Sequence, residues 1–303
     1  MISQLSLNKS KQLSTSVSLQ TDEQGAEYLV VEHAKLEASF SLFGAHLLHF
    51  KLMGQEPIIW LSDNAVFNTQ NAIRGGVPIC WPWFGPANKS LGDNLPSHGF
   101  ARNSFWSIGN VTELPHNAGV EITFLLKENE QTLKLWPFHF ELCLTATLTD
   151  TLKLDLQCTN TGKHPFAMTA ALHTYFNISS PNQCSIVGLG EAYVDKLNKN
   201  DLQVFTGDLK ISGAIDRIYS KAKDVIFIED HAFNRRIAIT NTGNDSDVVW
   251  TPWIAGAKSF SDMSDDGYLT MVCVESTITN TNSVKLAPSE SHHLITDITS
   301  IPQ

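Results

Sequence analysis

Two short apolar segments of the chain each carry one ionisable side chain that could take part in proton transfer. In the segment 166–177 (FAMTAALHTYFN), strand-like alternation places His173 and Tyr175 on one face, with small side chains beside them. In the segment 271–277 (MVCVEST), Glu275 shares its face with three other side chains: Met271, Cys273 and Thr277. A carboxyl in such surroundings is poorly solvated, so we expect its basicity to rise. A histidine and a glutamate across one polar cleft would suit general acid–base chemistry near neutral pH.

Each of these two side chains also has a structural interpretation. A single histidine in a strand is more often hydrogen-bonded within the fold, and a glutamate at the end of a strand usually faces water. The two segments taken alone leave both interpretations open.

The stretch 71–102 (NAIRGGVPICWPWFGPANKSLGDNLPSHGFAR) is predicted to be an irregular loop that lines a ligand cleft. Its density of glycine and proline is incompatible with a regular strand or helix. The loop nevertheless contains three large aromatic residues: Trp81, Trp83 and Phe84. It also contains Arg74 and Arg102, two of only five arginines in the chain. This combination predicts a site for an anionic or hydroxyl-rich ligand.

The residues of this loop also have less specific interpretations. His98, close to the end of the loop, could cap a turn or bind ligand hydroxyls. Arg74 and Arg102 could pair with structural carboxylates, as surface arginines usually do. The aromatic residues could simply belong to the core, and their joint occurrence with the arginines is what favours a ligand site.

The elements that must position these residues are predicted to be β-strands. Apolar residues alternate with polar ones, or form short β-branched runs, in several segments: 35–42, 142–148, 152–156, 225–228, 237–240 and 271–274. Polar turn clusters separate them, and no long helical periodicity competes. We therefore predict an all-β fold, a large antiparallel sandwich that forms one domain over residues 1–303. Residues 1–25 are expected to be an edge strand or a loosely held arm.

Composition narrows the classes of partner. The 303-residue chain has a formal net charge of −10, which argues against nucleic acid and anionic membranes as partners. The N-terminus lacks the apolar core of a signal peptide, and no apolar run reaches 18 residues. The five cysteines are odd in number, so we expect reduced packing residues of a cytoplasmic protein. The absence of an evident exposed apolar strip predicts a monomer.

The sequence makes no case for a metal or a cofactor. The segment 262–267 begins like a calcium loop, but its twelfth position is Cys273 instead of glutamate. The glycines at 188–190 lack the third glycine of a dinucleotide fingerprint. His46 and His49 are poorly spaced for ligating one ion.

Five segments of the chain, spread over about 200 residues, resemble the aldose 1-epimerase superfamily. They are RGGVPICWPWFGP (74–86), HGFARNSFW (98–106), ALHTYFN (171–177), SFSDMSDDGY (259–268) and VCVES (272–276). RGG and HGFAR make the chain similar, more narrowly, to the glucose-6-phosphate 1-epimerase (D-hexose-6-phosphate mutarotase) branch. The resemblance implies a large β-supersandwich, in agreement with the strand periodicity.

The resemblance also implies roles for particular residues. It implies that His173 is the general acid and Glu275 the general base. It implies that the sugar phosphate is held by three residues of the loop 71–102: Arg74, His98 and Arg102. Asp216 falls at the position of the family's substrate-binding aspartate, and Ser97 is a further candidate for substrate contact.

Three functions are compatible with these observations. The first is interconversion of the α and β anomers of a hexose 6-phosphate, with glucose 6-phosphate as the expected substrate. The second is an aldose 1-epimerase that acts on unphosphorylated hexoses. The third is a non-catalytic carbohydrate-binding sandwich, which would have no need of an opposed acid and base.

Overall fold

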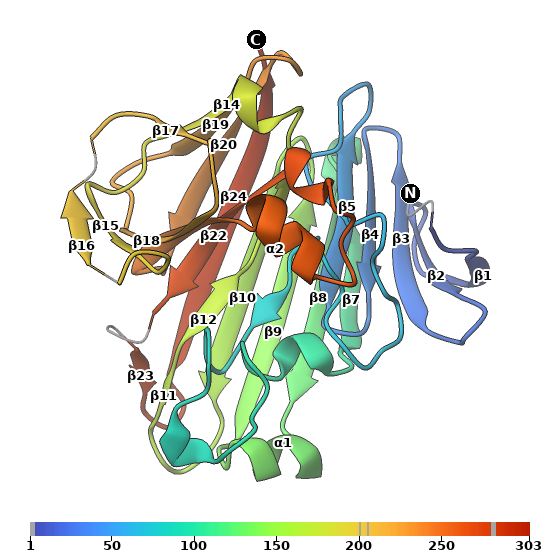
Figure 1. Ribbon diagram of the computed structural model, residues 1–303. Helices are drawn as coiled ribbons and strands as arrows, with labels where there is room; N and C mark the ends of the chain where they lie inside the picture. The colour runs from blue at the N-terminus through green and yellow to red at the C-terminus, as the bar shows by residue number, and fades with distance from the viewer. Residues whose placement is uncertain (1–3, 200, 205, 280–282) are drawn as a thin grey trace.

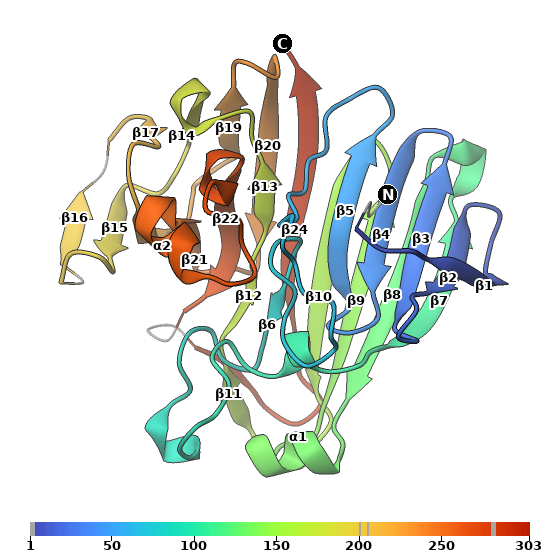
Figure 2. The same ribbon diagram turned by 45° about the vertical axis from the view of Figure 1, so that its right-hand side comes forward.

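The computed structural model describes residues 4–199, 201–204, 206–279 and 283–303, which form two layers of antiparallel strands (Figure 1). One layer is a nine-stranded sheet. A five-stranded sheet and an eight-stranded sheet lie side by side in the other layer, in front of the first (Figure 2). No helix in the described part of the chain is long and apolar enough to span a bilayer.

The nine-stranded sheet contains, in spatial order, β17 (Leu209–Lys210), β14 (Cys184–Val187), β19 (Ile226–Asp230), β20 (Arg235–Thr242), β24 (Ser291–Pro302), β10 (Leu152–Asn160), β9 (Phe140–Leu148), β8 (Val120–Lys127) and β7 (Ser107–Glu113). The five-stranded sheet runs in chain order through β1 (Asn8–Gln12), β2 (Val17–Thr21), β3 (Glu27–His33), β4 (Leu36–Ser41) and β5 (His46–Leu52). The N-terminal segment thus supplies an edge strand, β1, and its inner neighbour, β2.

The eight-stranded sheet carries most of the residues predicted to be functional. Its order is β16 (Leu202–Val204), β15 (Ala192–Asp195), β18 (Ile215–Ser220), β21 (Ser246–Thr251), β22 (Met271–Ile278), β12 (Ala170–Leu172) and β6 (Ile79–Cys80), and β13 (Tyr175–Asn177) also pairs with β22. A separate pair joins β11 (Phe166–Met168) to β23 (Val284–Leu286).

Helical segments are short and lie outside the sheets. The two α-helices are α1 (Glu130–Leu135) and α2 (Trp253–Ser259). Five 3₁₀ turns complete the described elements: η1 (Lys89–Leu91), η2 (Ala101–Asn103), η3 (Pro115–Asn117), η4 (Pro181–Gln183) and η5 (Gly267–Leu269). In Figure 2, α2 lies in front of β21 and β22, over the outer face of the eight-stranded sheet.

The core lies between the two layers, and it forms because apolar side chains occupy every second position of the strands. Along β9 and β10, every second side chain is buried while its neighbours are partly exposed. The rings of Phe40 in β4 and Phe124 in β8 lie 5.0 Å apart and join the layers. The strands predicted from alternation are therefore present, and each buries its apolar face.

The strand β22 is buried on both faces, which matters for the site. Val272 and Val274 pack in the main core, whereas Met271 and Cys273 pack on the outer face with Ala257 of α2. Glu275 lies on the same outer face as Cys273, two positions along the strand. The residues predicted to do chemistry are therefore on the side of the sheet that faces away from the second layer.

Candidate active site

The register of the sheet aligns His173 with Glu275. The segment predicted as one strand is divided: β12 pairs Leu172 with Ser276, and β13 pairs Tyr175 with Cys273. Both pairings belong to one antiparallel register, and extending it across the gap places His173 opposite Glu275. Such opposite side chains are neighbours on one face of a sheet, and His173 Nε2 lies 3.4 Å from Glu275 Oε1.

Backbone contacts of the loop 71–102 explain why the loop reaches the pair. The amide of His173 donates to the carbonyl of Pro78 at 3.1 Å, and the amide of Tyr175 donates to that of Gly76 at 3.0 Å. The segment that begins at Arg74 therefore runs alongside the histidine segment. The strand is divided at Thr174, whose amide donates to the carbonyl of Leu172 at 3.0 Å, and alternation alone does not reveal this local turn.

A row of side chains continues from the pair across the outer face of the sheet. Cys273 pairs with Trp250 of β21, and Trp250 pairs with Asp216 of β18. The pairing of β18 with β15 brings Lys196, next after β15, opposite Asp216, and Lys196 Nζ lies 3.6 Å from Asp216 Oδ1. The row thus brings Asp216 to the face that carries the catalytic candidates. It also adds Trp250 and Lys196, which sequence reasoning missed.

Burial controls the ionisation of the pair. Glu275 is 1% exposed and its Oε2 has no hydrogen-bond partner. Burial raises the pKa of Glu275 well above its usual value, and the nearby Asp216 charge adds to this effect. Burial also lowers the pKa of His173 well below its usual value, with further contributions from His98 and Arg102. The protein environment therefore favours the neutral form of both groups.

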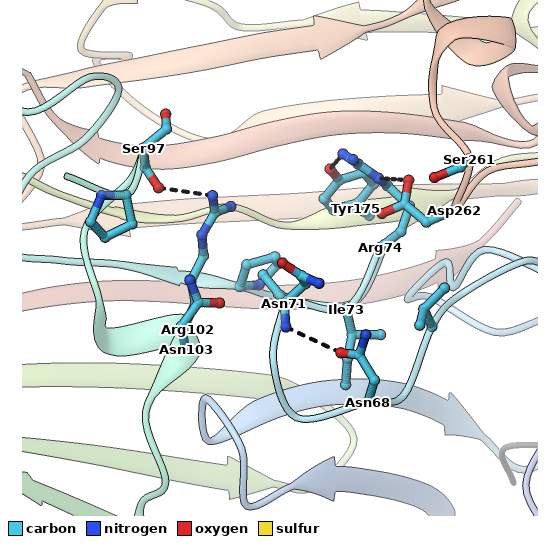
Figure 3. Close-up of a pocket in the computed structure, with 14 residues that line it drawn as sticks. Asn68, Asn71, Ile73, Arg74, Ser97, Arg102, Asn103, Tyr175, Ser261 and Asp262 are labelled. Atoms are coloured by element: carbon cyan, nitrogen blue, oxygen red, sulfur yellow. Dashed lines mark hydrogen bonds and ion pairs between the residues drawn. The ribbon is translucent and has the colours of Figure 1, made fainter. Parts of the chain in front are cut away.

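A cavity of about 550 Å³ is lined by both predicted arginines (Figure 3), and it adjoins the pair through Tyr175, since neither His173 nor Glu275 lines it. Tyr175 forms part of its wall, and the Tyr175 ring stacks on His173 with centroids 5.0 Å apart. Figure 3 shows Arg74 and Arg102 coming from different sides of the cavity. The remaining polar lining includes Asn68, Asn71, Ser97, Asn103, Ser261 and Asp262.

The two arginines differ in how firmly they are held. Arg74 donates from Nε to Asp262 Oδ1 at 3.1 Å and from Nη1 to the Tyr175 hydroxyl at 3.3 Å, and it lies over the ring of Phe260. Arg102 donates from Nη2 to the carbonyl of Ser97 at 2.9 Å, while its buried Nε has no partner. Both guanidinium groups border the cavity, so both are placed to meet an anion there. Ser97 is thus adjacent to the cavity and contacts Arg102 through its backbone.

His98 makes the structural contact that the sequence allowed, and its ring also lies near His173. Its Nδ1 accepts from the amide of Gly85 at 3.2 Å, which stabilises the loop. Its ring also lies 5.9 Å from the His173 ring, measured between centroids. Burial and the nearby Arg102 charge lower the pKa of His98 to about 3. His98 is therefore a neutral group beside the pair as well as a structural one.

A model of the aldose 1-epimerase family matches residues 27–299. The chain belongs to the aldose 1-epimerase family. It is 40% identical over 273 residues to the Escherichia coli (strain K12) protein named "Putative glucose-6-phosphate 1-epimerase", a match that covers 90% of each chain. A Cenchrus ciliaris protein of the same name is 36% identical over 261 residues, covering 83% of this chain and 78% of the relative.

A solved structure supports the same assignment. The crystal structure titled as a putative mutarotase (YeaD) from Salmonella typhimurium matches with a TM-score of 0.91 and 36% identity, over 98% of this chain and 97% of the other. The predicted membership of the aldose 1-epimerase family and the predicted β-supersandwich fold are both confirmed.

One aromatic residue of the loop 71–102 lies at this aldose 1-epimerase family site, and two do not. Trp81 and Trp83 are buried in the main core, where Trp81 packs edge-on against Trp136, so their alternative interpretation as core residues is correct. Phe84 instead packs with Val248 on the outer face of the sheet, and its ring centroid lies 5.0 Å from that of His98. Trp250 lies beside His173, with ring centroids 6.2 Å apart. Nothing in the local pattern of β21 distinguishes Trp250 from a packing residue, because the sheet register alone brings it to the site.

Asp262 is a further site residue that sequence reasoning missed. It belongs to the segment 259–268, which carries part of the family resemblance and contains the rejected calcium loop 262–267. The segment is made of turns and short helical pieces, and there Asp262 reaches Arg74. A carboxylate in a turn has many common explanations, and only the fold supplies its arginine partner, 188 positions away in the chain.

Substitution of one glycine in the loop 71–102 is expected to lower the stability of the protein measurably. Gly99 has a φ of +72°, and a Cβ there would lie 1.9 Å from the carbonyl oxygen of Trp81. We expect Gly99→Ala to lower the free energy of unfolding by at least about 2 kcal/mol, because both the backbone conformation and the space are unfavourable. Denaturant-induced unfolding measures this change.

Gly25→Ala is the matched control for Gly99→Ala. Gly25 has a similar φ of +83°, but nothing lies within 4 Å of the added Cβ. Its cost should be limited to the backbone conformation, about 1 kcal/mol. Equal costs for the two variants would show that the close approach of Gly99 to Trp81 is not a constraint on the fold.

Proposed function

We propose that this protein interconverts the α and β anomers of a hexose 6-phosphate, with glucose 6-phosphate as its substrate. The observation that carries the proposal is one imidazole–carboxyl pair, His173 and Glu275, beside a cavity with two arginines. The names of the relatives at 36–40% identity support the same substrate. An anion-binding cavity next to an acid–base pair is what a phosphorylated sugar requires.

The reaction needs two coupled proton transfers. Glu275, as the carboxylate, takes the proton of the C1 hydroxyl while the C1–O5 bond breaks and C1 becomes the carbonyl carbon of an aldehyde. His173, as the imidazolium, gives a proton to O5, which takes the electron pair of the broken bond. Rotation about C1–C2 then presents the other face of the aldehyde. The two residues reverse their roles as O5 attacks C1 and the ring closes.

The geometry of the pair suits this exchange. The pair carries one titratable proton throughout. Before ring opening this proton is on the imidazole of His173, and after ring opening it is on the carboxyl of Glu275. Burial favours the second distribution, in which both groups are neutral. The protein therefore stabilises the pair in the state that accompanies the open-chain sugar, because in that state neither buried group carries a charge.

The cavity orients the substrate. Arg74 and Arg102 bind the phosphate through charge-assisted hydrogen bonds, at the end of the sugar remote from C1. Asp262 and the Tyr175 hydroxyl hold the Arg74 guanidinium in place before the substrate arrives. His98 and Asp216 contact the sugar hydroxyls between these two ends, and Ser97 fixes Arg102. Binding energy from the phosphate thus positions the reacting carbon.

An anomerisation assay by exchange NMR tests the proposed substrate. We expect kcat/KM for glucose 6-phosphate to exceed that for glucose and for galactose by at least about tenfold, because each charge-assisted bond to the phosphate is worth roughly 1.5–3 kcal/mol. Equal rates for phosphorylated and free sugars would indicate an epimerase of unphosphorylated hexoses. Binding of sugars without any acceleration would indicate a carbohydrate-binding protein.

We further propose that the protein works in the cytoplasm as a monomer. The five cysteines are free, and four of them are buried, as expected for a chain in a reducing compartment. The monomeric state is tested by light scattering on the eluting protein.

A further inference from the structure

The thiol of Cys273 lies against the acid–base pair, and the proposed reaction does not use it. One ligand atom each of His173, Cys273 and Glu275 all lie within 4.8 Å of one another. Cys273 is fully buried, and Glu275 is 1% exposed. On one side Cys273 packs with the apolar Met271 and Ala257, and on the other side its thiol meets the polar His173 and Glu275.

The sheet register makes this cluster rigid. Cys273 and Glu275 are two positions apart on β22, so their side chains emerge on the same face of one strand. His173 stands opposite Glu275 in the extended register, next to Tyr175, which pairs with Cys273. The three donors therefore come from two adjacent strand segments, whose paired backbones fix the positions of the three Cα atoms.

Two donors in the cluster have spare binding capacity. Glu275 Oε2 and His173 Nδ1 are buried and have no hydrogen-bond partner, and the contact from His173 Nε2 to Glu275 Oε1 is long, at 3.4 Å. An unpartnered carboxylate oxygen at a side chain this deeply buried is costly unless a ligand completes it. The cluster thus has the donors of a binding site.

The donor set is that of zinc. Nitrogen, sulfur and oxygen from histidine, cysteine and glutamate are the ligands that Zn²⁺ takes, and sites with three protein ligands keep a fourth position open. Tetrahedral zinc with bonds of about 2.0–2.3 Å holds its ligand atoms roughly 3.3–3.8 Å apart. The separation of 3.4 Å between His173 Nε2 and Glu275 Oε1 meets this already, and the Cys273 thiol, which lies within 4.8 Å of the other ligand atoms, needs a shift of roughly 1–1.5 Å at most.

Charge balance favours the same ion. A thiolate and a carboxylate carry two negative charges, and a neutral imidazole adds none, so a divalent cation leaves the buried cluster neutral. Zinc binding releases the protons that the thiol and the carboxyl held before. Magnesium and calcium prefer oxygen ligands alone and are not expected here.

We propose that Zn²⁺ binds His173, Cys273 and Glu275 and thereby blocks the sugar site as a reversible inhibitor. The same imidazole and carboxylate cannot ligate zinc and transfer protons to a sugar at the same time. The competition with sugar rests on the proposed function, whereas the binding of zinc does not.

Metal titration of the full-length protein tests the binding. After removal of bound metal with a chelator, we expect one Zn²⁺ per chain, measured by competition with a chromophoric chelator. Co²⁺ at the same site should give a thiolate-to-cobalt charge-transfer band. Cys273→Ser should weaken zinc binding by about tenfold or more and remove that band, because a serine hydroxyl is a poor zinc ligand.

Cys143→Ser is the matched control. Cys143 is the partly exposed thiol among the five and lies on β9, in the other layer. Its replacement should leave zinc affinity and the cobalt band unchanged. A second variant, Glu275→Gln, keeps the side-chain shape and should weaken zinc binding while leaving the band in place, because the thiolate remains. Thermal unfolding without metal confirms that each variant is folded.

Different results would overturn the proposed zinc site and the proposed anomerisation reaction. Unchanged zinc affinity in Cys273→Ser, loss of binding in Cys143→Ser, or no zinc binding by the wild type would each overturn the proposed metal site. Glucose 6-phosphate should raise the apparent Kd for zinc, and failure to do so would overturn the competition alone. Absence of anomerase activity would refute the proposed function without affecting the zinc titration.

Discussion

We expect His173→Ala and Glu275→Gln each to lower kcat for the anomerisation of glucose 6-phosphate by ~10²–10⁴-fold, with KM changed much less. Each substitution removes one of two proton transfers that must occur together. Deprotonation of the C1 hydroxyl without protonation of O5 leaves uncompensated charge in a buried site. For the same reason, the double variant should lose little more than either single variant. Exchange NMR gives the rates, and calorimetry on the variants shows whether sugar binding survives.

His293→Ala is the control for loss of a histidine. His293 is exposed on β24, where it contacts Asp155 of the neighbouring strand β10, so its loss should not alter kcat. If the two active-site variants retained at least half of the wild-type kcat, the acid–base assignment would be wrong. A rise in KM with kcat unchanged would point to a role in binding alone.

Arg74→Ala and Arg102→Ala are expected to raise KM for glucose 6-phosphate by ~10–100-fold each, with a smaller effect on kcat. The estimate corresponds to the loss of one charge-assisted hydrogen bond of roughly 1.5–3 kcal/mol. Arg102 should show the cleaner effect, because its contacts within the protein are few. Arg74→Ala also leaves Asp262 without its partner, which adds repulsion toward a phosphate.

A comparison of glucose 6-phosphate with free glucose distinguishes loss of phosphate binding from general damage to the site. The same arginine variants should anomerise free glucose at the wild-type rate, since glucose has no phosphate to lose. Arg236→Ala supplies the control, because Arg236 on β20 contacts Glu229 on β19 in the other layer. A proportional loss with both sugars, or an unchanged KM for glucose 6-phosphate, would contradict the assignment of the arginines.

Much of the fold was predictable because antiparallel strands with one buried face have a simple sequence signature. The alternation in β9 and β10 identifies those strands directly, and the turn clusters mark their ends. The division of the segment 166–177 was not predictable. It coincides with a local backbone hydrogen bond from the Thr174 amide to the Leu172 carbonyl, which alternation does not encode.

The site likewise contains some residues that the sequence predicts and others that it does not. His173 and Glu275 are recognisable because an ionisable residue in an apolar strand is unusual, and the arginines because they are scarce. Trp250 and Lys196 reach the site only through the pairing of distant strands. Register is set by the whole sheet, so no local pattern reveals such neighbours.

The proposed acid–base pair and the proposed anion-binding residues belong to different kinds of backbone. Glu275 sits on β22, between paired neighbours on both sides, whereas Arg74 and Arg102 extend from a glycine- and proline-rich loop and Asp262 from a turn. A sheet interior tolerates few changes, while loops accept substitutions and insertions readily. Related chains could therefore acquire new sugar preferences through changes in the loop 71–102 and the turn at Asp262 alone. The sheet that carries His173 and Glu275, and with it the proton transfer, would stay unchanged.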